Sequence, residues 1–174
     1  MAVRANQRRD FERAVQVVSD SGGRIVGRTK LQKIAYLLEA TGLGEGFSFE
    51  YRHYGPYSEE VTAAARSAKL LGILTEEEHP TTWGGFYSIY TTSAVTGGET
   101  ARTQLAKIAV AADPIELELA ATAAFLAAEG NNDPLGETAR RKPEKASSTR
   151  LDSAKGLYRQ MQRVATPKRL PAIA

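Results

Sequence analysis

Apolar residues recur at helical spacing in three stretches of the first half of the chain. Side chains three and four positions apart form one face of an amphipathic helix, and a glycine follows each stretch as a stop signal. Thr29 and Gln32 have the spacing of a capping box, which predicts the start of the second helix at this point. The predicted buried stripes are Phe11, Ala14, Val15 and Val18; Leu31, Ile34, Ala35 and Leu38; and Val61, Ala64, Ala65, Ala68 and Leu71.

Aromatic and polar residues alternate between the second and third of these helices. Period-two alternation over residues 47–53 predicts a half-buried strand, with Tyr51 and His53 packed under the helices. Gly55-Pro56 is expected to break this strand, and Ser58 is a natural N-cap for the next helix. The segments 73–78 and 86–92 predict two further strands, joined by the turn-rich sequence HPTTWGG.

This order predicts a mainly α-helical fold with a minor β component. Three helices followed by a hairpin are the layout of a winged helix, a variant of the helix-turn-helix. Helical patterns continue in the second half, where Asp113-Pro114 marks a helix start. The predicted organisation is a winged-helix-like unit over 6–92, a loop at 93–99, C-terminal helices packing on that unit over 100–165, and a frayed tail at 166–174.

Composition narrows the classes of function. The 174 residues include no cysteine and two histidines, so we expect no disulfide, no metal centre and no cofactor. The N-terminus lacks the apolar core of a signal peptide, which favours a cytoplasmic protein. Residues 140–174 carry a net charge of +8 and the remainder −5, so the net charge of +3 hides an asymmetry. The basic segment either pairs with the acidic body, forms a solvated helical face, or meets an acidic partner.

Two candidate motifs for chemistry have simpler interpretations. The sequence GLGEG at 42–46 follows a helix and opens a strand, which is the reverse of a phosphate-binding loop, so we interpret it as a helix end. Glu76–Glu78 would be hydrated carboxylates at a hairpin tip rather than an acid/base pair. An enzyme built on His53 and Tyr54 remains a third hypothesis, and it requires a concave pocket that contains both rings.

Nucleic-acid binding is the second hypothesis, because a helix-turn-helix places its second helix in the major groove. That helix would begin at Ser58 and present Glu59 and Glu60 beside its basic residues, and Glu76–Glu78 on the wing would repel phosphates. Binding would then use basic surface outside the usual docking mode. The candidate residues are Arg28, Lys30, Lys33, Arg66, Lys69, Arg140, Arg141 and Lys142.

The motifs TKLQKIAYLLE and YRHYGPYSEEV together resemble the Panacea antitoxin domain, also called SocA-like, and its YwgA-like relatives. The matching positions are Lys30, Leu31, Lys33, Tyr54, Gly55, Pro56, Glu60 and Val61. The resemblance would cover about residues 10–163. It implies a bacterial or phage protein that works mainly by binding other proteins, in many members as an antitoxin that neutralises a partner toxin.

The leading hypothesis from the sequence is therefore a non-enzymatic protein-interaction module, acting as an antitoxin or an adaptor on a protein partner. Aromatic and arginine side chains are favoured anchors at protein interfaces. The expected partner-binding residues are Arg52, Tyr54, Tyr57, Trp83, Lys30 and Lys33. The expected structural motif consists of Gly55, Pro56, Ser58, Thr29 and Gln32.

Overall fold

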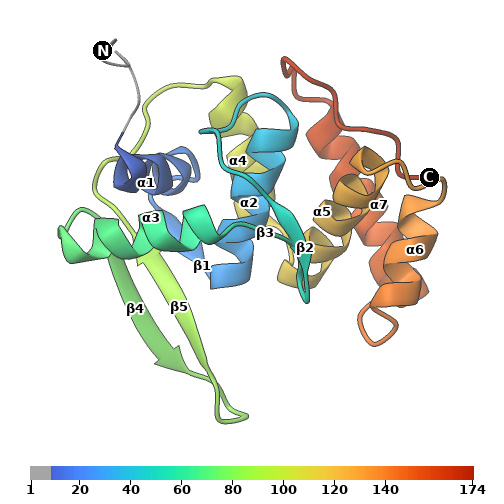
Figure 1. Cartoon of the computed structure of the whole chain (residues 1–174), viewed down its shortest axis with the longest axis horizontal. Helices are drawn as coiled ribbons and strands as arrows, with labels where there is room; N and C mark the ends of the chain where they lie inside the picture. Colours follow the sequence, from blue (N-terminus) through green and yellow to red (C-terminus); the bar gives the residue numbers. More distant parts are fainter. Residues whose placement is uncertain (1–8) are drawn as a thin grey trace.

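The computed structural model describes residues 9–174, which form helices and two small antiparallel sheets (Figure 1). This part of the chain is mainly α-helical with a minor β component, as predicted, and residues 6–8 of the predicted first unit lie outside it. The helices are α1 (Asp10–Asp20), α2 (Arg28–Ala40), α3 (Glu59–Leu70), α4 (Ala101–Ala111), α5 (Pro114–Ala128), α6 (Pro134–Arg141) and α7 (Ser148–Gln162). The strands are β1 (Arg24–Val26), β2 (Glu50–Arg52), β3 (Gly55–Tyr57), β4 (Thr75–Pro80) and β5 (Phe86–Thr91).

None of the helices described over residues 9–174 has the length and apolar character needed to cross a bilayer.

The first three helices bury most of the stripes that the sequence predicts. α1 packs against α3, and α2 packs against α4 and α5. Ser58 caps α3 as expected, because its hydroxyl oxygen accepts a hydrogen bond from the Val61 amide at 3.3 Å. Leu71 is exposed rather than buried, because α3 ends at Leu70 and the chain turns away.

The predicted capping box at Thr29 and Gln32 is wrong. α2 begins at Arg28 directly after Gly27, whose positive φ of 103° turns the chain from β1 into the helix and places Thr29 inside the first turn. The Gln32 side chain instead pairs with the backbone of Ser58. Its Nε2 donates to the Ser58 carbonyl at 3.0 Å and its Oε1 accepts from the Ser58 amide at 2.8 Å. Gln32 therefore ties the start of α3 to α2.

The larger sheet has the strand order β1-β5-β4 and is antiparallel throughout. The predicted hairpin is confirmed as β4 and β5, and it projects from the body of the molecule (Figure 1). Its turn closes on itself, since the Thr81 amide donates to the Gly85 carbonyl at 2.8 Å and the Gly85 amide donates to the Thr81 hydroxyl at 2.9 Å. The sequence prediction missed β1, whose three residues are too few for a periodic signal.

The predicted single strand over 47–53 is also wrong. Only Glu50–Arg52 is a strand, and Gly55–Tyr57 returns beside it as β3 instead of breaking the sheet. The turn falls at His53-Tyr54, and Gly55 has a positive φ of 93°. A side chain at Gly55 would have no room, because a Cβ there would lie 2.3 Å from the Thr122 hydroxyl oxygen of α5. The β2–β3 hairpin is thus pressed against the helical body.

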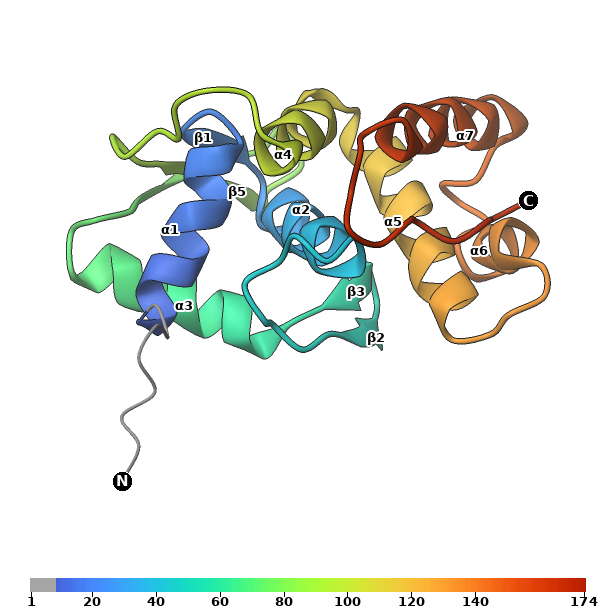
Figure 2. The same ribbon diagram turned by 90° about the horizontal axis from the view of Figure 1, so that it is seen from above.

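The second half of the chain is built around α5, which lies between α2 and the pair α6 and α7 (Figure 2). Nine of its fifteen residues are buried, since neighbouring helices cover several of its faces. Asp113 caps α5 as predicted, with its carboxylate accepting from the Ile115 amide at 2.9 Å, and Pro114 occupies the first helical position. The described chain has one continuous core formed from both halves.

The prediction of a frayed tail at 166–174 is wrong. Leu170 and Ile173 are buried in the same core as the helices. The Leu135 amide donates to the Ile173 carbonyl at 3.1 Å, the Lys168 amide donates to the Thr41 carbonyl at 2.9 Å, and the Tyr158 hydroxyl donates to the Pro171 carbonyl. The segment runs back from α7 over α5 towards α6 (Figure 2). Apolar burial and backbone hydrogen bonds therefore hold this terminal segment in place.

Candidate functional site

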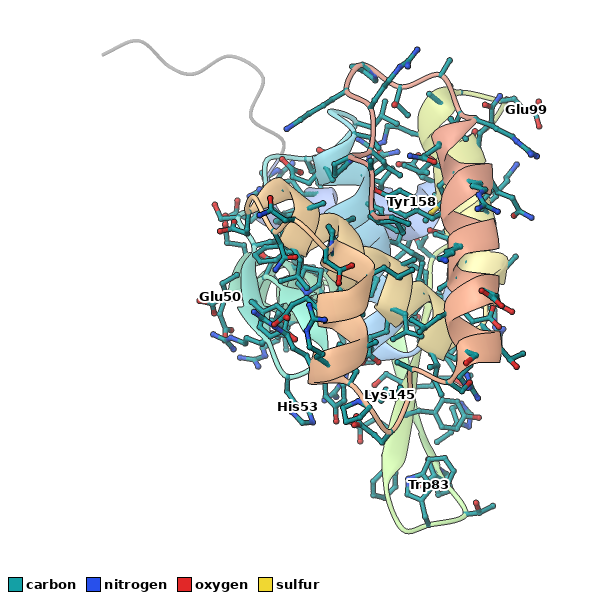
Figure 3. The ribbon with its side chains drawn as sticks, turned by 90° about the vertical axis from the view of Figure 1, so that its right-hand side faces the viewer. Glu50, His53, Trp83, Glu99, Lys145 and Tyr158 are labelled. Carbon is teal, nitrogen blue, oxygen red and sulfur yellow. The ribbon has the colours of Figure 1, made fainter. Side chains whose placement is uncertain are left out.

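A pocket of about 570 Å³ lies between the two hairpins. One wall is the β2–β3 turn, the opposite wall is the base of the β4–β5 hairpin, and α2 and α3 supply the remaining sides. A volume of this size is in the range of ligand pockets. Figure 3 shows His53 of the β2–β3 turn and Lys145 at the lower edge of the body, with Trp83 of the longer hairpin further out at the same end of the molecule. The turns of both hairpins therefore lie towards this end of the molecule.

The pocket brings together most of the residues that the sequence singled out. Four of the predicted partner-binding residues line it, namely Lys33, Arg52, Tyr54 and Tyr57. Three further residues predicted for nucleic-acid binding also line it, namely Arg28, Arg66 and Lys69, and the seven come from α2, α3 and the β2–β3 hairpin. Trp83 lies beyond it at the hairpin tip. Its lining includes Arg28, Thr29, Gln32, Lys33, Arg52, His53, Tyr54, Tyr57, Arg66 and Lys69.

The basic surface predicted at Arg28, Lys30 and Lys33 does not form. Lys30 is buried, and its ammonium group donates to the carbonyls of Val110 at 2.9 Å and Ala112 at 2.7 Å, which caps the C-terminal end of α4. Lys33 is only 1% exposed and donates to the Pro56 carbonyl at 2.8 Å. Lys30 and Lys33 thus supply internal hydrogen bonds rather than charges for a partner. Of the three predicted basic residues, only Arg28 has an exposed side chain.

Buried lysines anchor the β2–β3 hairpin from beneath. Lys33 holds the Pro56 carbonyl, and Lys142 donates to the His53 carbonyl at 3.0 Å. Lys142 also pairs with the buried Glu118 of α5 at 2.8 Å, and Lys145 pairs with the same carboxylate at 2.9 Å. Lys142 was predicted as a nucleic-acid contact, but this network takes it out of solvent. The segment Tyr54-Gly55-Pro56 is therefore held by these lysines on one side and packs against α5 on the other.

The charge balance of this network affects the protonation of Lys33. Burial lowers the pKa of its ammonium group to about 7; Glu118 acts in the opposite direction, and the nearby Lys142 and Lys145 lower the pKa further. One buried carboxylate faces three lysines, so the electrostatics favour a neutral amine at Lys33 near physiological pH. A neutral amine can still donate one hydrogen bond to the Pro56 carbonyl.

Carboxylates on the same surface already pair with most of the cations of the pocket. Arg28 contacts Glu76 at 3.0 Å and Glu78 at 2.9 Å. Arg52 contacts Glu59 at 2.7 Å and Glu50. Apart from the contact with the largely buried Glu76, these are exposed pairs that salt screens readily, and they leave little net positive charge around the opening.

Glu76 is not the hydrated tip residue that the sequence predicted. It lies at the base of the hairpin, the turn being at 81–85, and its side chain is 11% exposed. Burial alone would raise the pKa of the Glu76 carboxyl, but hydrogen bonds from the Ser88 hydroxyl at 2.7 Å and from Arg28 outweigh it and hold that pKa below its usual value. Lys69 approaches the same carboxylate at 3.7 Å. The side chain thus ties β4 to α2 and α3.

Aromatic rings stand at the rim and at the hairpin tip. Tyr54 is half exposed, and the His53 ring packs edge-on against it with 4.7 Å between centroids, so the predicted burial of His53 is wrong. Tyr57 is partly buried beneath the Arg52 guanidinium, which lies 4.4 Å from the ring centroid. Trp83 is 84% exposed and Phe86 is 71% exposed. Sequence reasoning missed Phe86, although alternation with the buried Ser88 and Tyr90 could have placed its ring on the pocket-facing side of β5.

The enzyme hypothesis requires a pocket that contains His53 and Tyr54, and both residues line this pocket. Within residues 9–174, however, no side chain hydrogen-bonds to the His53 ring to orient it as a general base. The described residues also contain no cluster of histidine, aspartate and glutamate side chains that could hold a metal ion. The geometry therefore offers a binding pocket more clearly than a set of reacting groups.

The remaining predicted basic residues lie on α6. Arg140 pairs with Glu137 at 2.9 Å, and Arg141 pairs with the same carboxylate at 2.8 Å. The Arg141 guanidinium also lies 4.7 Å from the centroid of the Tyr51 ring of β2. The Glu137 pairs lie within α6, whereas the Tyr51 contact joins α6 to β2. Together with the pairing of Lys142 and Lys145 to Glu118, it shows part of the basic segment in contact with the body, one of the interpretations that the sequence left open.

Comparison with known proteins shows similarity to a distant relative. No family model matches the chain. Over 79 residues, the chain is 34% identical to the uncharacterized protein YwgA of Bacillus subtilis (strain 168), and the match covers 45% of this chain and 46% of that protein. The matched region thus spans less than half the length of the relative. The similarity agrees with the YwgA-like part of the resemblance seen in the sequence.

Proposed function

We propose that this chain is a protein-interaction module whose binding face consists of the two hairpins and the pocket between them. The observation that carries the proposal is the exposed aromatic tip of the β4–β5 hairpin beside a pocket whose cations are largely paired. Tryptophan, tyrosine and arginine are the residues that contribute most at protein interfaces. Trp83 and Phe86 would enter an apolar cavity of the partner, while Arg52 and Tyr54 contact it from the opposite wall.

The charges around the pocket support a protein partner over nucleic acid. Binding to phosphates draws on lysine and arginine side chains that are free to replace counterions. Lys30, Lys33 and Lys142 are buried, and Arg28 and Arg52 at the rim already face carboxylates on the same surface. A polyanion would have to displace those carboxylates, whereas a protein surface of mixed charge would not.

The order of the elements supports a specialised winged helix. α1, β1, α2, α3, β4 and β5 follow one another as in that layout, with the β2–β3 hairpin inserted before α3. In this layout α3 would read DNA and β4–β5 would be the wing. α3 opens with Glu59 and Glu60, and the hairpin carries acids at its base and aromatic rings at its tip, so this version of the fold favours protein binding. Together with the resemblance to Panacea domains, it suggests an antitoxin or adaptor.

The test uses the full chain purified with an affinity tag from its native host. A protein that co-purifies in stoichiometric amount is identified, produced separately and titrated with the chain by calorimetry. The variant Trp83→Ala/Phe86→Ala should weaken binding roughly 100-fold, because two anchor rings are removed. Val95→Ala truncates an exposed apolar side chain in the 93–99 loop, away from the hairpins, and should leave binding within about threefold of the wild type.

Failure to recover a stoichiometric protein under several growth conditions would count against the proposal, as would unchanged affinity of the double variant. DNA or RNA retained at low salt, with affinity falling steeply as salt rises, would instead favour the nucleic-acid hypothesis.

A further inference from the structure

One exposed cation of the pocket differs from the other exposed cations there in having no carboxylate partner. Arg28 shares Glu76 and Glu78, and Arg52 shares Glu50 and Glu59. Arg66 lines the same pocket, yet within residues 9–174 no carboxylate or hydrogen-bond acceptor contacts its guanidinium group. Because guanidinium groups remain charged at all physiological pH values, the pocket holds one permanent positive charge that the protein itself does not neutralise.

A second, weakly paired cation stands next to Arg66. Lys69 is one turn further along α3, and side chains three residues apart lie on the same face of a helix. Lys69 lines the same pocket, and its ammonium group approaches a carboxylate only at 3.7 Å, the Glu76 carboxylate that Arg28 also holds. Arg66 and Lys69 can therefore turn towards a shared anion without first breaking a strong contact.

We propose that the pocket accepts a single carboxylate carried by the partner protein, held by Arg66 and Lys69. This proposal rests on the proposed function, since it assigns the chemistry of the partner's residue. The stem of that residue would pass the aromatic wall of Tyr54 and Tyr57, which explains why the opening combines rings with one uncompensated charge. A planar carboxylate matches the fork of the guanidinium group with two parallel hydrogen bonds.

The surrounding acids distinguish a carboxylate from a phosphate. A phosphate monoester carries a charge close to −2 at neutral pH. Glu76, Glu78 and Glu59 all lie around this pocket and would repel the second charge. Arg28 and Lys69 are balanced by Glu76 and Glu78, so the net positive charge left is that of Arg66, which a monoanion matches and a dianion exceeds.

The experiment titrates the isotope-labelled full chain with 3-phenylpropionate and follows amide chemical shifts by NMR. We expect saturable shifts at pocket residues with roughly millimolar affinity, as is usual for so small a ligand. The neutral isostere 3-phenylpropanamide should bind at least about tenfold more weakly, because the charge-assisted hydrogen bonds to Arg66 are lost. Arg66→Met should remove the preference for the acid, and Lys69→Met should reduce it.

Arg159→Met is the matched control, since Arg159 is an exposed arginine on α7 outside the pocket, and it should leave the preference unchanged. Thermal melts of all variants verify that Arg66→Met remains folded. Equal binding of acid and amide, or an acid preference that survives Arg66→Met, would overturn the proposal. Tighter binding of phenyl phosphate than of 3-phenylpropionate would overturn the inference that the pocket prefers a monoanion to a dianion. These fragment titrations need no partner, so their result is separable from the co-purification test of the proposed function.

Discussion

The two hairpins that flank the pocket are attached to the protein in different ways. The β2–β3 hairpin has three-residue strands, and it rests on α5 at Gly55 while Lys33 and Lys142 hold its carbonyls. The β4–β5 hairpin has six-residue strands, is held to the helices mainly at its base, and extends into solvent beyond it (Figure 1). One wall of the site is thus fixed by the core, and the other is free at its tip.

This difference separates stability from recognition. Changes beneath the β2–β3 hairpin should act on folding, because they disturb buried charges and close backbone packing. Truncation of the exposed aromatic side chains at the tip of the β4–β5 hairpin should act mainly on binding, because these side chains contact solvent. The four predictions below test this contrast from the largest expected effect on stability to the smallest.

Glu118→Gln should have the largest effect. It removes the carboxylate that compensates buried Lys142 and Lys145, so the free energy of unfolding should fall by roughly 3–5 kcal/mol. Arg28→Met breaks the comparable pairs at the base of the free hairpin, but these are mostly exposed and should cost at most about 1 kcal/mol. Urea denaturation of both variants measures the difference. Equal losses would show that the two hairpins are not anchored differently.

Gly55→Ala and Gly84→Ala compare the two turns at nearly the same backbone geometry. Both glycines have φ near +90°, at 93° and 91°. A Cβ at Gly84 meets nothing within 4 Å, so only the backbone penalty of roughly 1–2 kcal/mol is expected. A Cβ at Gly55 also collides with Thr122, so we expect a loss of about 3 kcal/mol or more. A lower free energy of unfolding for Gly84→Ala than for Gly55→Ala, measured by denaturation, would contradict this order.

Lys33 should make stability depend on pH near neutrality. Its pKa is about 7 in the folded chain and near 10.5 when unfolded, so between these values the unfolded state binds more protons and stability rises with pH. From pH 7 to pH 9, we expect the wild type to gain about 2 kcal/mol relative to Lys33→Met. The groups that face Lys33, namely Glu118, Lys142 and Lys145, are retained in both proteins. Parallel stability curves would refute the assignment, and Lys155→Met on α7 should follow the wild type.

Trp83→Ala should leave stability almost unchanged. The ring is 84% exposed, so its removal should alter the free energy of unfolding by less than about 0.5 kcal/mol. The same substitution should weaken partner binding at least about tenfold if the ring is an anchor. Thermal melting and calorimetry on the same preparation separate the two quantities. A large loss of stability would mean that the tip packs on the body in solution.

The helices and the long hairpin follow from local rules, which is why sequence reasoning located them. The i, i+3, i+4 stripes of α1, α2 and α3, the Ser58 and Asp113 caps, and the alternating segment of β5 all depend on neighbours in the chain. β1 and β3 have three residues each, and their pairing partners lie elsewhere in the chain or across an unusual turn. Such short strands exist because of their partners, so local patterns do not predict them.

The site was predictable in its residues but not in their roles. Aromatic and basic residues near Tyr54 were identified, and the fold brings most of them around one pocket. Lysine normally remains in solvent, so no pattern in the sequence indicates that Lys30, Lys33 and Lys142 are buried. Their partners are backbone carbonyls and a glutamate far along the chain. Only three-dimensional contacts show that Arg66, not these lysines, carries the uncompensated charge.

The closed turn of the long hairpin makes it a natural place to change specificity. Thr81 and Gly85 hydrogen-bond to each other, so the three residues between them are held at their ends by the turn itself. Side-chain substitutions in this turn would disturb neither core packing nor a buried charge. Related chains could therefore acquire new partners by exchanging a few residues around Trp83, while the helices, the lysine anchors and the pocket stay the same.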